Sequence, residues 1–160
     1  MDRFSESQIL KSFMKLKKDF FERDVKTVAM ALLGSSVCTL NKEGSVVRSV
    51  IVETEAYDGE KDLACHARNG KTQRNSIMYE SGGVWYVYLC YGMHILCNVV
   101  TGEKDSGQAV LIRAARVISG EEIIRKRRNG RIDLIGPGKV GQALGLSVQD
   151  SGKKLGDCFH

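Results

Sequence analysis

The sequence predicts an α+β protein with a single main domain, in which a mainly antiparallel curved sheet is flanked by helices and carries a protruding β-hairpin. Several runs of β-type residues follow one another with short, turn-like connections. Helical patterns stand mostly before and after these runs, which is the order expected of an α+β fold. The length of 160 residues suits one domain with a hydrophobic core of its own.

The first half of the chain divides as follows. Residues 1–18 are expected to be a loosely attached N-terminal segment, followed by the domain at 19–160. A helix is expected at 24–33, because apolar residues recur there at helical spacing, with Asp24 placed to cap its start and Gly34 to end it. Strands are expected at 36–40 and 46–57, joined by a turn at 41–44.

The second half begins with a polar segment, 58–83, which is rich in Gly, Asn, Lys and Arg and is expected to form a loop with a short helix. Strands at 84–90 and 95–101 are expected to form a hairpin, and a further strand is expected at 108–117. Helices at about 119–128 and from 136 to about 144 complete the chain.

Composition narrows the function only in part. The net charge of +5 and the pI near 9 suit an anionic partner such as nucleic acid without naming one. No apolar run is long enough for a transmembrane helix, and the N-terminus lacks the pattern of a signal peptide. We therefore expect an intracellular protein, in the cytoplasm or nucleoid of a bacterium or in the nucleus of a eukaryote.

The cysteines favour free thiols over a metal site. Their number, five, is odd, no CxxC pair occurs, and only three histidines are present. Neither a zinc site nor a disulfide framework is supported by this pattern. We expect most of the thiols to be buried.

The strand at 46–57 carries the most informative polar residues. Strict alternation places Ile51, Glu53, Glu55 and Tyr57 on one face, where an ionised carboxylate in a half-buried strand needs a partner. Arg113 lies within another apolar strand and could pair with either glutamate. A purely structural ion pair explains this pattern as well as a catalytic one does.

Asn98 and the hairpin tip raise similar questions. An amide inside the apolar run 95–100 needs hydrogen-bond partners, and it could read the edge of a ligand or support a nearby loop. Tyr91 and Met93 stand at a tip where small polar residues are usual. Such a tip on a basic protein suits insertion between DNA base steps, and it would also suit a protein–protein contact.

Five motifs together resemble the alkyladenine (3-methyladenine) DNA glycosylase family. They occur in the family's order and close to its spacing between about Phe20 and Asp157. The motifs are Glu53-Thr54-Glu55-Ala56-Tyr57, His66-Ala67-Arg68, Thr72-Gln73-Arg74-Asn75, Tyr86-Val87-Tyr88-Leu89-Cys90-Tyr91-Gly92-Met93 and Leu111-Ile112-Arg113-Ala114.

The resemblance implies a monofunctional enzyme of base-excision repair that flips alkylated or deaminated purines out of double-stranded DNA and hydrolyses the N-glycosidic bond. It implies that Glu55 activates the attacking water and that Arg113 helps to hold this water. No metal or cofactor is implied. Because no lysine lies in the motif 53–57, attack by water is expected rather than Schiff-base chemistry.

The resemblance also assigns the residues that bind the base and the DNA. Tyr57 corresponds to one wall of an aromatic slot that holds one everted purine, and His66 and Tyr88 correspond to the other wall. Asn98 corresponds to the residue that crowds the 2-amino group of guanine. Tyr91 corresponds to the side chain that fills the gap in the duplex, and Met93 is expected to intercalate beside it.

Two departures from the family pattern bear on these expectations. His94 stands near the hairpin tip where the family has an aromatic residue. Family members also continue past the position of His160 through further strands, so the chain is expected to be shortened at its C-terminal end. The alternative function is a catalytically weak or inactive DNA-binding module on the same scaffold. In either case the protein is expected to be a monomer.

Overall fold

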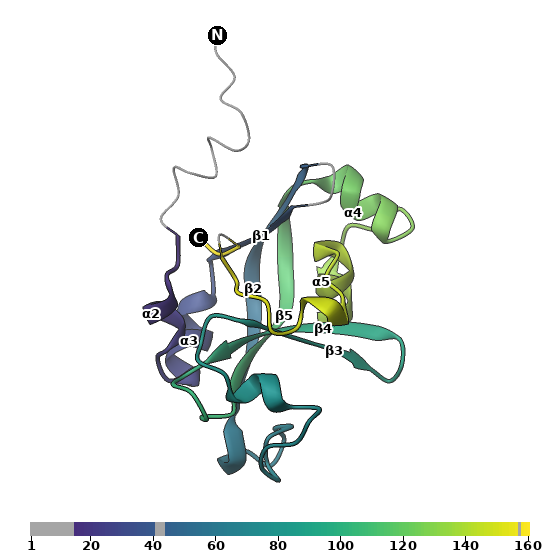
Figure 1. The fold of residues 1–160 in the computed structure, drawn as a ribbon. Coiled ribbons are helices and arrows are strands. Elements are labelled where there is room, and N and C mark those ends of the chain that lie inside the picture. The colour runs from purple at the N-terminus through teal and green to yellow at the C-terminus, as the bar shows by residue number, and fades with distance from the viewer. Residues whose placement is uncertain (1–14, 41–43, 157) are drawn as a thin grey trace.

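The structure, a computed structural model, describes residues 15–40, 44–156 and 158–160 (Figure 1). Residues 1–14 of the expected N-terminal segment and 41–43 of the expected turn lie outside this description. The helices are α2 (Lys18–Phe21), α3 (Val25–Leu32), α4 (Glu121–Arg127) and α5 (Pro137–Leu144), with short 3-10 turns η1 (Gly59–Lys61), η2 (Ser76–Tyr79) and η3 (Val148–Asp150). The strands are β1 (Ser36–Leu40), β2 (Val46–Asp58), β3 (Trp85–Cys90), β4 (His94–Thr101), β5 (Gln108–Ser119) and β6 (Leu134–Ile135).

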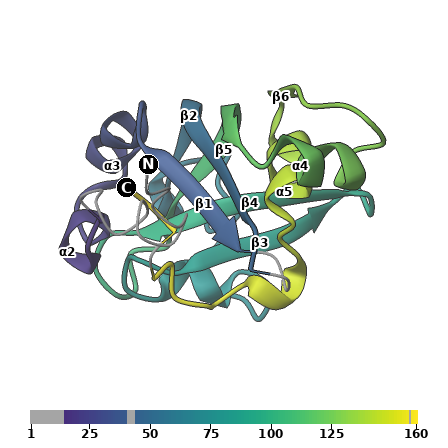
Figure 2. The same cartoon turned by 90° about the horizontal axis from the view of Figure 1, so that it is seen from above.

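The six strands form one antiparallel sheet, which confirms the predicted α+β fold. The strand order is β1-β2-β5-β4-β3, and β6 pairs with β5. Viewed from above, α2 and α3 lie towards one end of the sheet and α4 and α5 towards the other (Figure 2). The β3–β4 hairpin projects from the body of the molecule, as expected (Figure 1).

Helix α3 shows how local sequence sets the ends of an element. The side chain of Asp24 accepts hydrogen bonds from the backbone N–H groups of Lys26 and Thr27, which satisfies two donors that a helix start leaves open. Gly34 follows the helix with a φ of +83°, a conformation that favours glycine. The buried face of α3 then packs on the sheet and forms part of the main core.

Two hydrophobic clusters lie within the described residues. The main core includes α3, α5, the buried face of the central strands and Phe159 near the C-terminus. The second cluster lies under segment 58–83 and contains Tyr79, Tyr86 and Ala109, with Tyr57 and Tyr88 packed against it. In Figure 1 the ribbon of β3 and β4 separates α5 from segment 58–83. The second cluster therefore lies on the side of the hairpin that faces segment 58–83, and it holds the rings of Tyr57, Tyr86 and Tyr88 in place.

The C-terminal residues also belong to the fold. The backbone N–H of Leu16 donates to the carbonyl of Phe159 at 3.0 Å, and Val37 forms an isolated bridge with Phe159. Phe159 is 1% exposed and contacts Phe21 and Trp85 through their rings. Trp85 of the hairpin thus packs against an aromatic ring from the C-terminal segment. The proposed boundary between residues 18 and 19 stays a prediction.

Candidate active site

A row of cross-strand neighbours places residues from four strands on one line across the sheet. Tyr86 of β3 is opposite Asn98 of β4, Asn98 is opposite Leu111 of β5, and Leu111 is opposite Glu55 of β2. Directly opposite residues project to the same face of a sheet. The register thus brings the predicted Glu55 and Asn98 to the face that carries the second cluster.

Two of the three irregularities in the β2–β5 ladder redirect side chains near this row. Ile51 is paired with Ala115 and Glu53 with Ala114, so Val52 is an extra residue on β2. The next pair on β5 skips Arg113, which is an extra residue on that strand. Bulges of this kind re-aim side chains and are common beside active sites.

The bulge at Val52 corrects one expectation. Strict alternation placed Ile51 on the same face as the two glutamates. In the structure Ile51 is fully buried in the main core, whereas Glu53 and Glu55 are partly exposed. The extra residue reverses the alternation at this point, which frees the glutamates from the core without disturbing the apolar residues before them.

Glu55 is held through both of its carboxylate oxygens. Arg113 Nη1 lies 3.0 Å from Oε1, and the Tyr57 hydroxyl donates to Oε2 at 2.5 Å. Arg113 also donates from Nε to Oε1 of Glu53 at 3.1 Å. Arg113 and Tyr57 therefore fix the orientation of Glu55, and the predicted pairing of Arg113 takes place with both candidate glutamates.

An aromatic slot lies beside this carboxylate. The rings of His66 and Tyr88 are 4.7 Å apart between centroids, and His66 Nδ1 is 3.0 Å from the Tyr86 hydroxyl. The slot is lined by Tyr57, Ala64, His66, Met78, Tyr86, Tyr88, Asn98 and Ala109, and its volume is about 50 Å³. That volume has room for a few waters and is smaller than a purine. The structure therefore brings the four predicted base-pocket residues together in a slot narrower than expected.

The histidine and tyrosine side chains that line the slot are uncharged near pH 7. Burial, with a smaller contribution from the nearby charge of Arg74, lowers the pKa of His66, so its imidazole is uncharged. Burial raises the pKa of Tyr86 and of Tyr88 to about 12 each, and burial and Glu55 raise that of Tyr57. Neutral aromatic faces are suited to stacking against a base.

Asn98 is 2% exposed and donates from Nδ2 to the backbone carbonyl of Tyr86 at 3.1 Å. This bond satisfies part of the amide and fixes it in the floor of the slot. Both interpretations of Asn98, as a residue that contacts a ligand and as one that supports its surroundings, are therefore compatible with its position, because it bonds to the hairpin backbone and also lines the slot.

The hairpin tip lies outside the slot. Tyr91 is 90% exposed with a φ of +49°, and Met93 is 70% exposed. A bulky residue at positive φ is unusual and often has a functional reason. His94, which departs from the family pattern, lies beside Gly138 in the first turn of α5, where a Cβ on that glycine would come within 3.1 Å of its ring.

Sequence reasoning overlooked Asn75 and Tyr86 as parts of the site. Asn75 is buried and donates to the carbonyls of His66 and Gly70, so it holds the loop that presents His66. The signal available in the sequence was weak, because an asparagine in a polar segment looks like an ordinary turn residue. Tyr86 was named only as part of a motif, although its hydroxyl lies 3.0 Å from Nδ1 of His66 and orients the imidazole.

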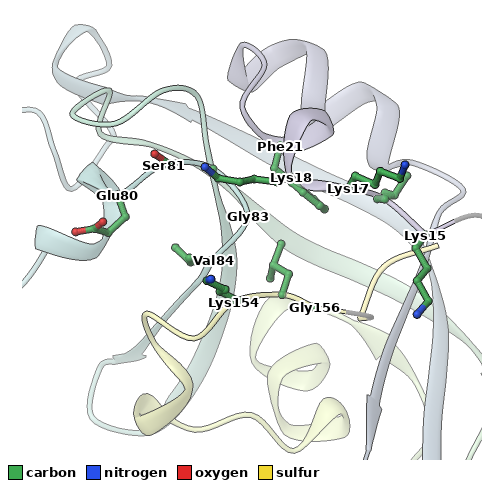
Figure 3. A pocket seen from close by; sticks show the side chains of 13 residues that line it. Lys15, Lys17, Lys18, Phe21, Glu80, Ser81, Gly83, Val84, Lys154 and Gly156 are labelled. Atoms are coloured by element: carbon green, nitrogen blue, oxygen red, sulfur yellow. The ribbon is translucent and has the colours of Figure 1, made fainter.

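A cavity much larger than the slot lies elsewhere in the described part of the chain. It measures about 660 Å³ and lies between α2 and the segment around Leu155, at the end of β3 away from the hairpin tip (Figure 3). Its lining residues include Phe21, Val84, Lys18 and Lys154. None of the predicted site residues lines it, so cavity size alone would have pointed away from the carboxylate and the slot.

Comparison with known proteins defines the class of the molecule. The sequence pattern of the methylpurine-DNA glycosylases matches residues 19–159, which cover nearly all of the described fold. The class is that of DNA-repair hydrolases that remove bases from DNA. The chain belongs to the methylpurine-DNA glycosylase family.

Individual bacterial relatives agree with this membership. A protein of Chlamydia pneumoniae, provisionally named 3-methyladenine DNA glycosylase, is 49% identical over 85% of this chain and 72% of its own length. A protein of Nitrosococcus oceani with the same provisional name is 48% identical over 81% of this chain and 63% of its own length. One of Corynebacterium glutamicum is 46% identical over 82% and 62% respectively.

No helix among the described residues combines the length and apolar character needed to cross a membrane.

Proposed function

We propose that this chain is a monofunctional DNA glycosylase that hydrolyses the N-glycosidic bond of damaged purines after flipping them out of the duplex. The proposed substrates are purines of the 3-methyladenine, 7-methylguanine, hypoxanthine and ethenoadenine class. The observation that carries the proposal is the Glu55 carboxylate, held by Arg113 and Tyr57 beside an aromatic slot. Family membership supports it independently.

The proposed reaction uses Glu55 as the general base. The bond between the sugar C1′ and the purine nitrogen breaks, and its electron pair leaves with the base. The sugar then carries positive charge, which an ionised carboxylate stabilises. Water adds to C1′, and its proton passes to Glu55. Arg113, which already contacts Glu55 Oε1, has further N–H donors that can hold the water.

The slot gives this chemistry its selectivity. A damaged or mispaired base costs less to flip than a normal one, and stacking returns about 1–3 kcal/mol per base. In our proposal Tyr57, His66 and Tyr88 supply the stacking faces, and Asn98 crowds the 2-amino group of guanine. The narrow slot requires these walls to separate as the base enters, which is feasible because His66 lies on a partly exposed loop.

The hairpin tip performs the other half of base flipping. Tyr91 fills the gap that the everted nucleotide leaves, with Met93 beside it. Their high exposure supports this role, because apolar side chains in solvent are available to enter the base stack. In this proposal one protein molecule acts on each lesion, so sedimentation should show a monomer free in solution and a one-to-one complex with a short duplex.

The proposal is tested by base release. Purified protein is incubated with matched duplexes that contain hypoxanthine, 1,N6-ethenoadenine or only normal bases, and the free base and the abasic site are quantified. Release from at least one damaged duplex, with none from the normal duplex, supports the proposal. Tight binding without any release would instead support the inactive DNA-binding module.

A further inference from the structure

The guanidinium of Arg113 is shared between two carboxylates of the same strand. Its Nε donates to Glu53 Oε1 at 3.1 Å, and its Nη1 lies 3.0 Å from Glu55 Oε1. The side chains of Glu53, Arg113 and Glu55 are 51%, 41% and 35% exposed. The resemblance to the glycosylase family gave Glu53 no role.

We propose that Glu53 is a positioning residue that holds Arg113 in place for Glu55 and gives the three-residue cluster a net negative charge. This inference rests on the proposed function, since it concerns the same site. Glu53 itself does not contact the substrate in our account; it acts through Arg113.

The first argument concerns the orientation of Arg113. A single, partly exposed ion pair stabilises little and leaves a long side chain free to move. Two carboxylates that bind different nitrogens of the planar guanidinium restrict the orientation of the arginine side chain more than one carboxylate does. The two bulges make this possible, because they set Glu53 free of the core and leave Arg113 as an extra residue next to Ala114, the partner of Glu53, from where its side chain reaches Glu53.

The second argument concerns the moment of reaction. When Glu55 accepts a proton from water, its carboxyl becomes neutral and its attraction for Arg113 weakens. Glu53 is not the acceptor of this proton, so its contact with Arg113 is not weakened by the reaction. Arg113 therefore remains fixed and can continue to hold the oxygen that bonds to the sugar.

The third argument is charge balance. Arg113 and Glu55 alone form a neutral pair, which gives little net stabilisation to a cationic sugar. Glu53 adds a second negative charge and restores a net charge of minus one to the cluster. Without the charge of Glu53, the positive charge of Arg113 would cancel much of the electrostatic stabilisation that Glu55 gives to the sugar.

The activity test uses Glu53→Gln in the full chain. Single-turnover release of hypoxanthine should slow by about tenfold or more, because the chemical step loses both orientation and charge. Binding of the same duplex should be unchanged or tighter, because a negative charge near a polyanion is removed. A merely structural role would weaken binding and lower the melting temperature as well. Glu53→Asp, which keeps the charge, should recover part of the rate.

A matched control removes a carboxylate from a different exposed arginine pair. Glu121 Oε2 lies 3.6 Å from Arg125 Nη2 on α4, and Glu121→Gln makes the same change in net charge. This variant should keep its excision rate within about twofold of the wild type. Excision by Glu53→Gln at the wild-type rate would overturn the proposal.

A second measurement needs no activity. The ¹H–¹⁵N signal of the Arg113 Nε–H, assigned by its loss in Arg113→Lys, should be shifted and protected from exchange in the free wild type. It should move to the position of a solvent-exposed arginine in Glu53→Gln and stay largely in place in Glu55→Gln. The same signal in wild type and Glu53→Gln would refute the positioning role. If the wild type releases no base, the proposed function fails, while this signal still decides whether Glu53 holds Arg113.

Discussion

The hydroxyl of Tyr57 donates a hydrogen bond to Oε2 of Glu55, while Oε1 of the same carboxylate is held by Arg113. The ring of Tyr57 thus forms a wall of the slot, and its hydroxyl orients Glu55, the proposed general base. In the proposed mechanism Tyr57 therefore serves both binding of the purine and the chemistry at its glycosidic bond, and the two contributions can be separated by substitution.

Tyr57→Phe should separate them. The ring and its stacking face remain, so binding to a hypoxanthine duplex should change little. Glu55 loses one of the contacts that orient it, and single-turnover excision should fall by about tenfold, as for the loss of a hydrogen bond to a charged group. Tyr57→Ala is the control and should weaken binding and excision together. An unchanged rate in Tyr57→Phe would show that the hydroxyl is not needed.

Tyr91→Asn tests the hairpin tip. The wild-type tyrosine has a φ of +49°, a conformation that costs about 1 kcal/mol for a bulky residue and is tolerated by asparagine. Chemical denaturation should therefore show equal or slightly greater stability. Base flipping, followed by the fluorescence of an ethenoadenine in the duplex, should weaken by about tenfold, whereas undamaged DNA should be bound almost as before. Tyr91→Phe should keep both the stability and the base flipping of the wild type. Equal losses of binding to damaged and undamaged DNA in Tyr91→Asn would argue against insertion of Tyr91 into the duplex.

Gly141→Ala tests the packing of α5 against the sheet. A Cβ at this position would come within 2.2 Å of the backbone oxygen of Ile95, which neither side can easily avoid. The free energy of unfolding should fall by about 1–3 kcal/mol. Gly138→Ala on the same helix is the milder control, because the nearest atoms that its Cβ would meet belong to the side chain of His94, at 3.1–3.2 Å rather than 2.2 Å. Equal stability of the two variants in urea denaturation would contradict this packing.

The pKa of His66 predicts a pH dependence of stability. Burial and Arg74 lower this pKa below its ordinary value of 6.5. The folded state therefore resists protonation, so the contribution of His66 to stability is complete above pH 6.5 and is lost as the pH falls through the lowered pKa. The melting temperature of the wild type should exceed that of His66→Gln more at pH 7.5 than at pH 5. A gap that is constant or widens at low pH would contradict the assigned direction.

Much of the fold followed from local sequence patterns. The expected strand at 36–40 has the observed bounds of β1, and Asp24 and Gly34 delimit α3 as expected. These elements were predictable because capping, turn chemistry and alternation are local. The two-residue strand β6 was missed, because Leu134 and Ile135 form a strand only through their pairing with β5.

The candidate site was predictable in its residues but not in its geometry. The motifs identified Glu55 and Arg113, and residues alone left open which glutamate the arginine would meet. The answer depends on the bulges at Val52 and Arg113, which arise from pairing between strands about sixty positions apart and leave no local signature. The roles of these residues in catalysis stay predictions.

The most direct test of the account is single-turnover excision by Glu55→Gln, measured with its affinity for the same hypoxanthine duplex. Glutamine keeps the size of the side chain but cannot take a proton from water. We predict that the variant binds the damaged duplex as tightly as the wild type and releases base at least about a thousandfold more slowly. Release at a rate close to that of the wild type, with binding intact, would contradict the assignment of Glu55 as the general base.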